Sequence, residues 1–239
     1  MTCPKTRWRR PRPWLRDLPL LVPILLLVGC TTAQRIRDRP ISFSDWRQAA
    51  TLSYISDHYN RTFDEISITP RIIVLHWTAI DDLEETFTRF DAEALPNIRS
   101  DLGAPGQVNV SSHFLVDRDG TIYRLMPETW MARHAIGLNL SAIGVENVGG
   151  GGGVDNMTRQ QISSNIRLVR YLKKKYSSIE YLIGHSEYRE FEGHPLWLEI
   201  DDGYRTEKID PGDRMMSAVR AAVSDLARPA FFRSSETSR

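Results

Sequence analysis

Ile72-Ile73-Val74-Leu75-His76 is a continuous run of apolar and β-branched residues that ends in a histidine. Such a run is typical of a strand buried on both faces of a sheet. Ile143-Gly144-Val145-Glu146 and Tyr181-Leu182-Ile183-Gly184-His185 have the same form. Because the carboxyl ends of parallel strands meet at one edge of a sheet, we expect the three polar residues that end these runs to lie close together.

The segments around these strands read as helices and a hairpin. Residues 82–95, 158–175 and 213–227 carry apolar residues at helical spacing, residues 44–59 do so more weakly, and Thr158 with Gln161 has the spacing of a capping box. Asp117-Arg118-Asp119-Gly120 predicts a hairpin between residues 113–116 and 121–125. The sequence therefore predicts a single α/β domain with a central mixed β-sheet and flanking helices.

The first 29 residues predict export from the cytoplasm. They hold six Lys or Arg and one Asp, followed by an apolar run over residues 18–28 that is interrupted by two prolines. A spanning helix needs about 20 apolar residues, so this run fits a cleaved signal better than a membrane span. Leu27-Val28-Gly29-Cys30 also resembles the lipobox of bacterial lipoproteins, in which the cysteine is acylated. The alternative is an ordinary signal cut near the same place, with Cys30 incidental.

The expected organisation follows from this signal. Residues 1–29 are the predicted signal peptide, residues 30–43 a tether attached to lipid through Cys30, residues 44–228 the catalytic domain, and residues 229–239 a disordered tail. The residue directly after Cys30 is Thr31, whereas an Asp at that position would resemble an inner-membrane retention signal. We therefore expect an exported bacterial lipoprotein at the periplasmic face of the outer membrane, anchored through the lipid.

Composition excludes some partners and leaves others open. The whole chain has a net charge of +1, so the part after residue 29 carries about −4, which argues against a nucleic-acid partner. Removal of Cys3 with the signal leaves Cys30 as the one remaining cysteine, so no disulfide can form within the mature chain. We expect a monomer.

Lys208-Ile209-Asp210-Pro211-Gly212 adds a carboxylate held by a turn. Two imidazoles and one carboxylate are ligands that zinc accepts, with a fourth position left for water. We predict that His76, His185 and Asp210 bind Zn²⁺, that Glu146 accepts a proton from the attacking water, and that Lys208 stabilises the oxyanion. The alternative for Glu146 and Lys208 is a structural salt bridge.

The order of several short motifs resembles the zinc-dependent N-acetylmuramoyl-L-alanine amidases, which share a fold with peptidoglycan recognition proteins. These motifs are His-Trp-Thr-Ala at 76–79, Ser-His-Phe-Leu-Val at 112–116, Arg-His-Ala at 133–135, Asn139 to Glu146, Gly-His-Ser at 184–186, and Lys-Ile-Asp-Pro-Gly at 208–212. The resemblance, from about residue 71 to residue 214, implies the same roles for the five residues above. It further implies cleavage of the amide between N-acetylmuramic acid and L-alanine in peptidoglycan or muropeptides, with Trp77, His113, His134 and Asn139 contacting the substrate.

Two departures from the family pattern bear on substrate choice. Where the family commonly has Trp-His-Ala-Gly, residues 132–137 read Ala-Arg-His-Ala-Ile-Gly. About 22 residues, 186–207, separate His185 from Lys208, and we expect them to form a loop over the cleft rim. His194 in this segment could compete as a metal ligand by residue type, but its place in a Gly-His-Pro sequence favours a solvated side chain. Two other functions stay open: a peptidoglycan-binding lipoprotein that does not cut, and a zinc peptidase, for which a His-Glu-x-x-His motif is absent.

Overall fold

The computed structural model describes residues 35–96 and 107–228. The described residues belong to one compact unit. The expected signal peptide, Cys30 and the expected tail at residues 229–239 lie outside the described residues. Within the described ranges, no helix combines the length and apolar character needed to cross a membrane.

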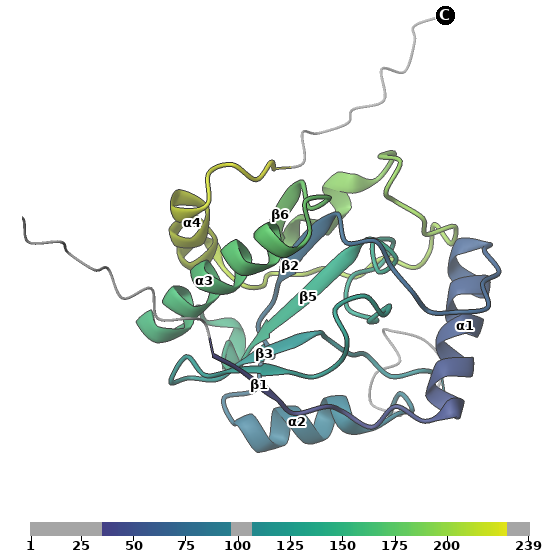
Figure 1. Ribbon diagram of the computed structural model, residues 1–239, viewed down its shortest axis with the longest axis horizontal. Helices are drawn as coiled ribbons and strands as arrows, with labels where there is room; N and C mark the ends of the chain where they lie inside the picture. Colours follow the sequence, from purple (N-terminus) through teal and green to yellow (C-terminus); the bar gives the residue numbers. More distant parts are fainter. Residues whose placement is uncertain (1–34, 97–106, 229–239) are drawn as a thin grey trace, which may run out of the picture. The chain divides into compact units, whose positions relative to one another are not determined.

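A six-stranded sheet forms the centre of the described part of the chain (Figure 1). Its strands are β1 (Ile36–Asp38), β2 (Ile72–Leu75), β3 (Phe114–Val116), β4 (Ile122–Arg124), β5 (Ala142–Asn147) and β6 (Tyr181–Gly184), in the order β1-β4-β3-β5-β2-β6. The β3–β4 hairpin is antiparallel, and the other neighbouring pairs are parallel. This arrangement confirms the mixed sheet that the sequence predicts.

Four α-helices flank the sheet: α1 (Asp45–Tyr59), α2 (Leu83–Asp91), α3 (Arg159–Lys175) and α4 (Asp213–Ala222). Two 3₁₀ segments, η2 (Gly151–Gly153) and η3 (His185–Phe191), complete the secondary structure of the described residues. Side chains of Ser44 and Asp82 cap α1 and α2, and Thr158 with Gln161 forms the predicted capping box on α3. Each side-chain cap satisfies a backbone amide that the first turn leaves without a helical partner.

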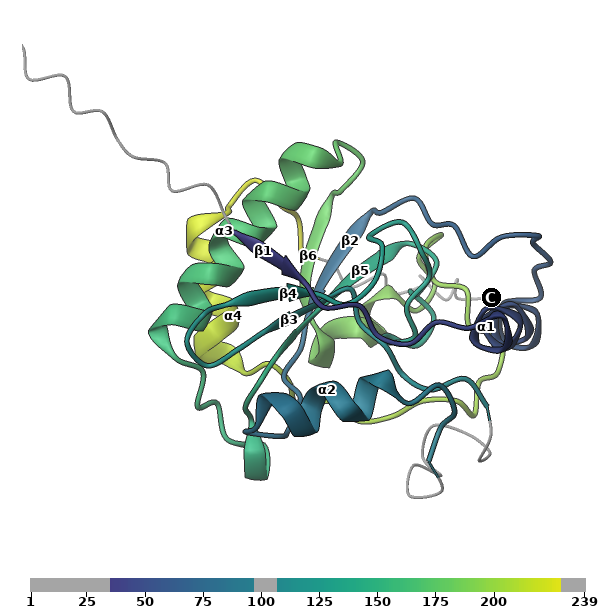
Figure 2. The same ribbon diagram turned by 60° about the horizontal axis from the view of Figure 1, so that its bottom comes forward.

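The two faces of the sheet have different partners. Ile73 and Leu75 of β2 and Val145 of β5 pack in one cluster with α3 and α4, whereas Ile72 and Val74 belong to a cluster on the opposite face. Figures 1 and 2 show α3 and α4 together on the first of these faces. Side chains alternate between the two faces along a strand. His76 directly follows β2 and His185 directly follows β6, so both side chains point away from α3 and α4.

Two boundaries differ from the sequence prediction. Residues 36–38, assigned to the tether, form β1, which pairs in parallel with β4, so the folded unit begins before residue 44. The last helix ends at Ala222 rather than at residue 227. There the chain turns back to the sheet edge, where the Ala227 amide donates to the carbonyl of Glu180 at 2.8 Å. Pairing with the exposed edge of β6 replaces the last helical turn.

Candidate metal centre and active site

His76, His185 and Asp210 form a buried group at the carboxyl ends of β2 and β6. Asp210 Oδ2 lies 3.4 Å from Nδ1 of His76 and 3.2 Å from Nδ1 of His185. The three possible ligand atoms lie within 4.8 Å of one another. The structure therefore brings together the three residues that the sequence predicts as metal ligands.

Backbone hydrogen bonds fix the positions of this group. The His76 amide donates to the carbonyl of Val145 at 2.8 Å, which extends the pairing of β2 with β5 by one residue. The Ser186 amide donates to the carbonyl of Asp210 at 2.9 Å, which joins the segment after β6 to the segment before α4. Backbone hydrogen bonds thus connect the group to the carboxyl ends of β2 and β6.

His134 sets the tautomer of His76. Nε2 of His134 lies 3.3 Å from the carbonyl oxygen of Ala142, which can only accept, so this nitrogen carries the proton. Nδ1 of His134 is then an acceptor, and Nε2 of His76, 3.0 Å away, donates to it. Nδ1 of His76 is left with its lone pair facing Asp210.

The backbone around His134 is shaped to hold this ring. A Cβ atom at Gly144 would lie 2.8 Å from Cγ of His134, so the strand passes the imidazole at a distance that only glycine allows. The Asn139 side-chain oxygen accepts from the amides of His134 and Ala135 at 2.9 and 2.8 Å, and its nitrogen donates to the hydroxyl of Tyr59. Asn139 therefore stabilises the loop that carries His134.

Burial and neighbouring charges keep His76 and Asp210 in the forms that bind cations. Burial, and after it the charge of nearby His185, lower the pKa of His76 to about 4, so the imidazole is neutral near pH 7. Burial raises the pKa of Asp210, but His185 and His76 outweigh this effect and hold that pKa well below its usual range. A neutral His76 imidazole and an Asp210 carboxylate anion are the result.

The spacing of the donor atoms suits zinc. Two atoms bound to one tetrahedral zinc ion at about 2.0 to 2.1 Å lie about 3.3 to 3.4 Å apart. The measured separations from Asp210 Oδ2 are 3.4 and 3.2 Å. The lone pair on Nδ1 of His76 faces a carboxylate oxygen, and such a contact is repulsive unless a cation lies between them. The donor set therefore fits a zinc ion.

A cavity of about 240 Å³ opens beside this group. Glu146 and Lys208, the predicted proton acceptor and oxyanion-stabilising residue, both line it. Glu146 is 8% exposed, and its Oε1 lies 4.0 Å from Nδ1 of His76, farther than the ligand spacing above. Trp77 also lines the cavity, but most of its ring is buried in the core cluster beneath α3 and α4.

His113 does not line the cavity, contrary to the substrate contact predicted for it. It is fully buried, its Nε2 lies 2.8 Å from the carbonyl of Trp130, and its Nδ1 accepts from the Gly144 amide at 3.0 Å. The two ring nitrogens therefore contact β5 at Gly144 and the loop between β4 and β5 at Trp130. His113 is thus a structural residue below the site.

The insertion between His185 and Lys208 forms part of the cavity wall, through Tyr204 and Thr206. Tyr188 fixes its end, because its hydroxyl accepts from the Thr206 amide at 2.9 Å and donates to the Thr206 carbonyl at 2.8 Å. His194, the competing ligand, lies beside the rings of Tyr181 and Phe191 and outside the metal group.

The opposite end of the insertion rests on α1. The carboxylate of Glu199 is buried and lies 3.1 Å from Nδ1 of His58 in α1. Tyr54 of α1 and Arg133 also line the cavity. The sequence did not single out Tyr54 or Tyr204, because nothing in the local pattern indicates that α1 and the insertion meet at the site.

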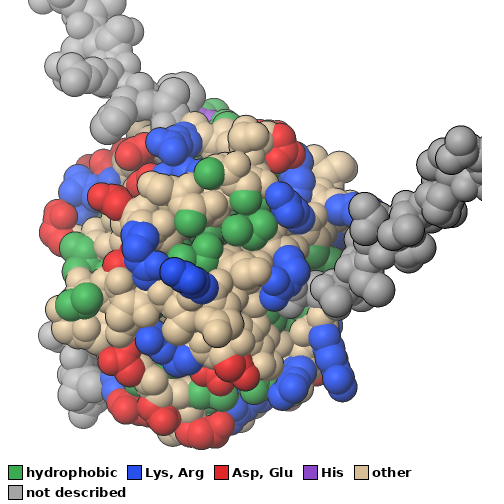
Figure 3. Space-filling model, turned by 90° about the vertical axis from the view of Figure 1, so that its left-hand side faces the viewer, with side chains coloured by type: hydrophobic (Ala, Val, Ile, Leu, Met, Phe, Trp, Pro, Cys, Tyr) green, Lys and Arg blue, Asp and Glu red, His purple; other side chains and the backbone are tan. Residues whose placement is uncertain are grey.

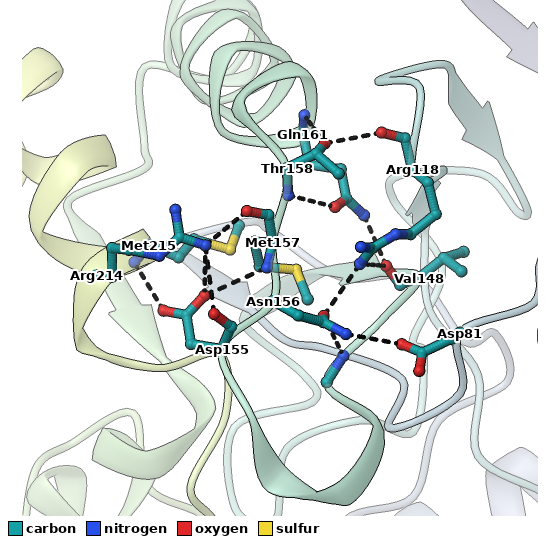
Figure 4. A network of polar contacts seen from close by, with 11 residues as sticks. Asp81, Arg118, Val148, Asp155, Asn156, Met157, Thr158, Gln161, Arg214 and Met215 are labelled. Carbon is teal, nitrogen blue, oxygen red and sulfur yellow. Dashed lines mark hydrogen bonds and ion pairs between the residues drawn. The ribbon is translucent and has the colours of Figure 1, made fainter.

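Asp155 holds the segment that carries Asp210 (Figure 4). Its Oδ2 accepts from the Met215 amide in the first turn of α4 at 3.2 Å, and its Oδ1 accepts from Arg214 at 3.0 Å. A Cβ atom at Gly212, whose φ is +88°, would lie 2.7 Å from Asp155 Oδ2. The carboxylate therefore caps α4 from another part of the chain and fixes the turn that follows Asp210.

Comparison with known proteins identifies relatives of this domain. The sequence model of the family described as N-acetylmuramoyl-L-alanine amidase matches residues 67–213, which include all three candidate ligands, Glu146 and Lys208. No curated protein sequence matches the chain.

Solved structures show the same fold at low sequence identity. The endolysin amidase LysCS from Clostridium intestinale URNW is 22% identical, with a TM-score of 0.50 over 80% of this chain and 95% of that one. LysC from the same organism is also 22% identical, with a TM-score of 0.50 over 80% of this chain and 99% of that one. A selenomethionine derivative of AmpD is 21% identical, with a TM-score of 0.50 over 80% and 95%.

Proposed function

Because the chain belongs to the N-acetylmuramoyl-L-alanine amidase family, we propose that it hydrolyses the amide bond between N-acetylmuramic acid and the L-alanine of the peptidoglycan stem peptide, with Zn²⁺ as cofactor. The observation that carries this proposal is the buried His76, His185 and Asp210 group, with donor spacings that suit zinc, beside a cavity lined by Glu146 and Lys208. A zinc ion held there would supply Lewis acidity, which polarises the scissile carbonyl and makes water a stronger acid.

The residues of this chain divide the remaining work. Glu146 accepts the proton of the attacking water at its carboxylate and returns it to the leaving nitrogen of L-alanine. The ammonium group of Lys208 stabilises the negative charge that develops on the carbonyl oxygen. His134 keeps His76 in the tautomer whose Nδ1 lone pair points into the site.

Digestion of purified peptidoglycan tests the proposal. The protein from Gln34 onward should release free stem peptides, and a chelator should stop the release until zinc is added back. If the protein binds peptidoglycan but releases no peptide with zinc present, it is a recognition protein and the proposed hydrolysis is wrong. Release that continues at full rate after zinc has been removed would refute the cofactor.

We also propose that the mature protein begins at Cys30, carries lipid there and is held at the periplasmic face of the outer membrane. The support is the Leu27-Val28-Gly29-Cys30 sequence after a short apolar run. Labelling of cells with a fatty-acid analogue should mark the wild-type protein and leave Cys30→Ser unmarked. Label in the Cys30→Ser protein would place the lipid elsewhere and overturn this assignment.

A further inference from the structure

Helix α3 carries a stripe of positive charge along its solvent face. Its 17 residues include six Lys or Arg and no Asp or Glu. Five of these are exposed. Four of the five, Arg159, Arg167, Arg170 and Lys174, follow one another at intervals of eight, three and four residues, which places them on one side of the helix. We call these four residues the α3 stripe. It runs about 22 Å along the helix axis, at 1.5 Å per residue.

Contacts within the chain account for only part of the stripe. Arg167 donates to the hydroxyls of Ser163 and Ser164, and Arg170 donates to the carbonyl of Ala222 in α4. Cations near a helix C-terminus interact favourably with the helix dipole, which explains Lys173, Lys174 and Lys175. Arg159 lies in the first turn, where the dipole disfavours a positive charge. Surface helices are commonly stabilised by acid and base side chains four residues apart, and α3 contains no acid with which to form such a pair. The charge pattern therefore points to something outside the helix.

The stripe lies on the side of the domain away from the active site. Helices α3 and α4 cover one face of the sheet, and no residue of α3 lines the active-site cavity. Figure 3 shows this side, with Lys and Arg side chains gathered over it and Asp and Glu mainly toward its margins. A ligand held by the stripe would leave the cavity open to a second, separate molecule.

The chain enters the fold beside α3. Ile36 of β1 packs against the same cluster that contains Leu168 and Leu172 of α3. Cys30 precedes Arg35, the first described residue, by five residues, which span at most about 17 Å when extended. If Cys30 carries the lipid, as proposed above, the side of the domain that bears α3 is held close to the headgroups of the bilayer.

We propose that the α3 stripe docks on anionic phospholipid headgroups of the membrane to which the protein is anchored. The part of the chain after residue 29 has a net charge of about −4, so its net charge is repelled by an anionic surface, whereas the positive charge of the α3 stripe complements such a surface. Docking in this way turns the cavity away from the bilayer. A short tether then presents a defined face to the cell wall instead of allowing free rotation.

Vesicle binding by the unlipidated compact unit, which begins at Gln34, tests the proposal without the contribution of the lipid. The wild-type protein should bind phosphatidylcholine vesicles that contain phosphatidylglycerol, bind pure phosphatidylcholine vesicles weakly, and dissociate as salt is raised. The double variant R159E/K174E should bind at least about 25-fold more weakly, because each cation near an anionic bilayer contributes about fivefold. The matched variant R61E/R189E, which changes the net charge equally but lies outside α3, should retain binding.

Three results would overturn the proposal: equal binding to the two kinds of vesicle, equal loss in the two double variants, or unchanged binding of R159E/K174E. Tighter binding of the wild-type protein to single-stranded DNA than to anionic vesicles would also overturn it, since the stripe would then fit a nucleic acid better. Peptide release from purified peptidoglycan is measured on the same preparations, and R159E/K174E should release peptide at the wild-type rate. Failure of hydrolysis in all proteins would count against the proposed function, and failure of vesicle binding against the α3 stripe.

Discussion

Replacement of Glu146 by Gln, compared with replacement of Asp210 by Asn, separates proton transfer from metal binding. Both changes turn a carboxylate into an amide of nearly the same shape. Oε1 of Glu146 lies 4.0 Å from Nδ1 of His76, whereas Oδ2 of Asp210 lies 3.4 Å from it. Only the second distance matches the spacing of about 3.3 to 3.4 Å between two ligands of one tetrahedral zinc ion. The two variants should therefore fail in different ways.

The expected magnitudes follow from these positions. Glu146→Gln should lower kcat by about 10² to 10⁴, the usual contribution of a general acid or base, which corresponds to roughly 3 to 5 kcal/mol of activation free energy. Its zinc affinity should stay close to that of the wild type. Asp210→Asn removes the anionic member of the donor set, and its zinc affinity should fall by more than about 100-fold, beyond the loss typical of an outer partner of a ligand.

Two measurements on each protein decide between the roles. Competition with a fluorescent chelator gives the zinc affinity, and release of stem peptides from purified peptidoglycan at saturating zinc gives kcat. Loss of zinc from Glu146→Gln comparable to the loss from Asp210→Asn would mean that Glu146 is a ligand. Wild-type kcat in Glu146→Gln would remove the carboxylate from proton transfer altogether, and the role assigned to it would be wrong.

Three further changes test the structure around the site. Gly144→Ala places a Cβ atom 2.8 Å from the His134 ring, so we expect about 1 to 3 kcal/mol of lost stability and a zinc affinity about 10- to 100-fold weaker, measured by thermal unfolding and chelator competition. Burial lowers the pKa of His113 to about 4, below the value of about 6.5 in an unfolded chain, so its contribution to stability is complete above pH 6.5 and decreases by about 3 kcal/mol as the pH falls to 4. Urea unfolding of His113→Gln should therefore show a deficit relative to wild type that shrinks on acidification, and a constant deficit would contradict the shift. Asp155→Ala should cost about 1 to 2 kcal/mol in urea unfolding, through the lost cap on α4, and an unchanged midpoint would show that this cap contributes nothing.

The elements that the sequence predicts well are those whose pattern is local. Apolar runs mark β2, β5 and β6, and the capping box marks the start of α3. Strand β1 is different, because Ile36-Arg37-Asp38 has one apolar residue and becomes a strand only by pairing with β4, more than 80 residues later. A pairing with so distant a partner leaves no periodic signal in the short segment itself.

The candidate site divides in the same way. The three ligands follow strands or precede a fixed turn, so their convergence can be anticipated from topology. His113 and His134 belong to the same stretch of motifs and look equivalent in sequence. Their roles depend on which backbone groups each ring meets: Trp130 and Gly144 for His113, and Ala142 together with the ring of His76 for His134. Such contacts across strands are set by the three-dimensional arrangement.

Arg133 connects the two departures from the family pattern, the changed Trp-His-Ala-Gly motif and the insertion. Its guanidinium carbon lies 4.7 Å from the centre of the Tyr54 ring, so a flat cation stacks where the family commonly has an indole. Unlike an indole, it also donates to the hydroxyl of Tyr204 in the insertion, at 3.0 Å, and to the carbonyl of Val108. Because Tyr204 lines the cavity, the arginine and the insertion together form one wall of the site. The changed motif and the insertion are therefore in direct contact at one wall of the cavity, and we expect substrate preference to depend on both together.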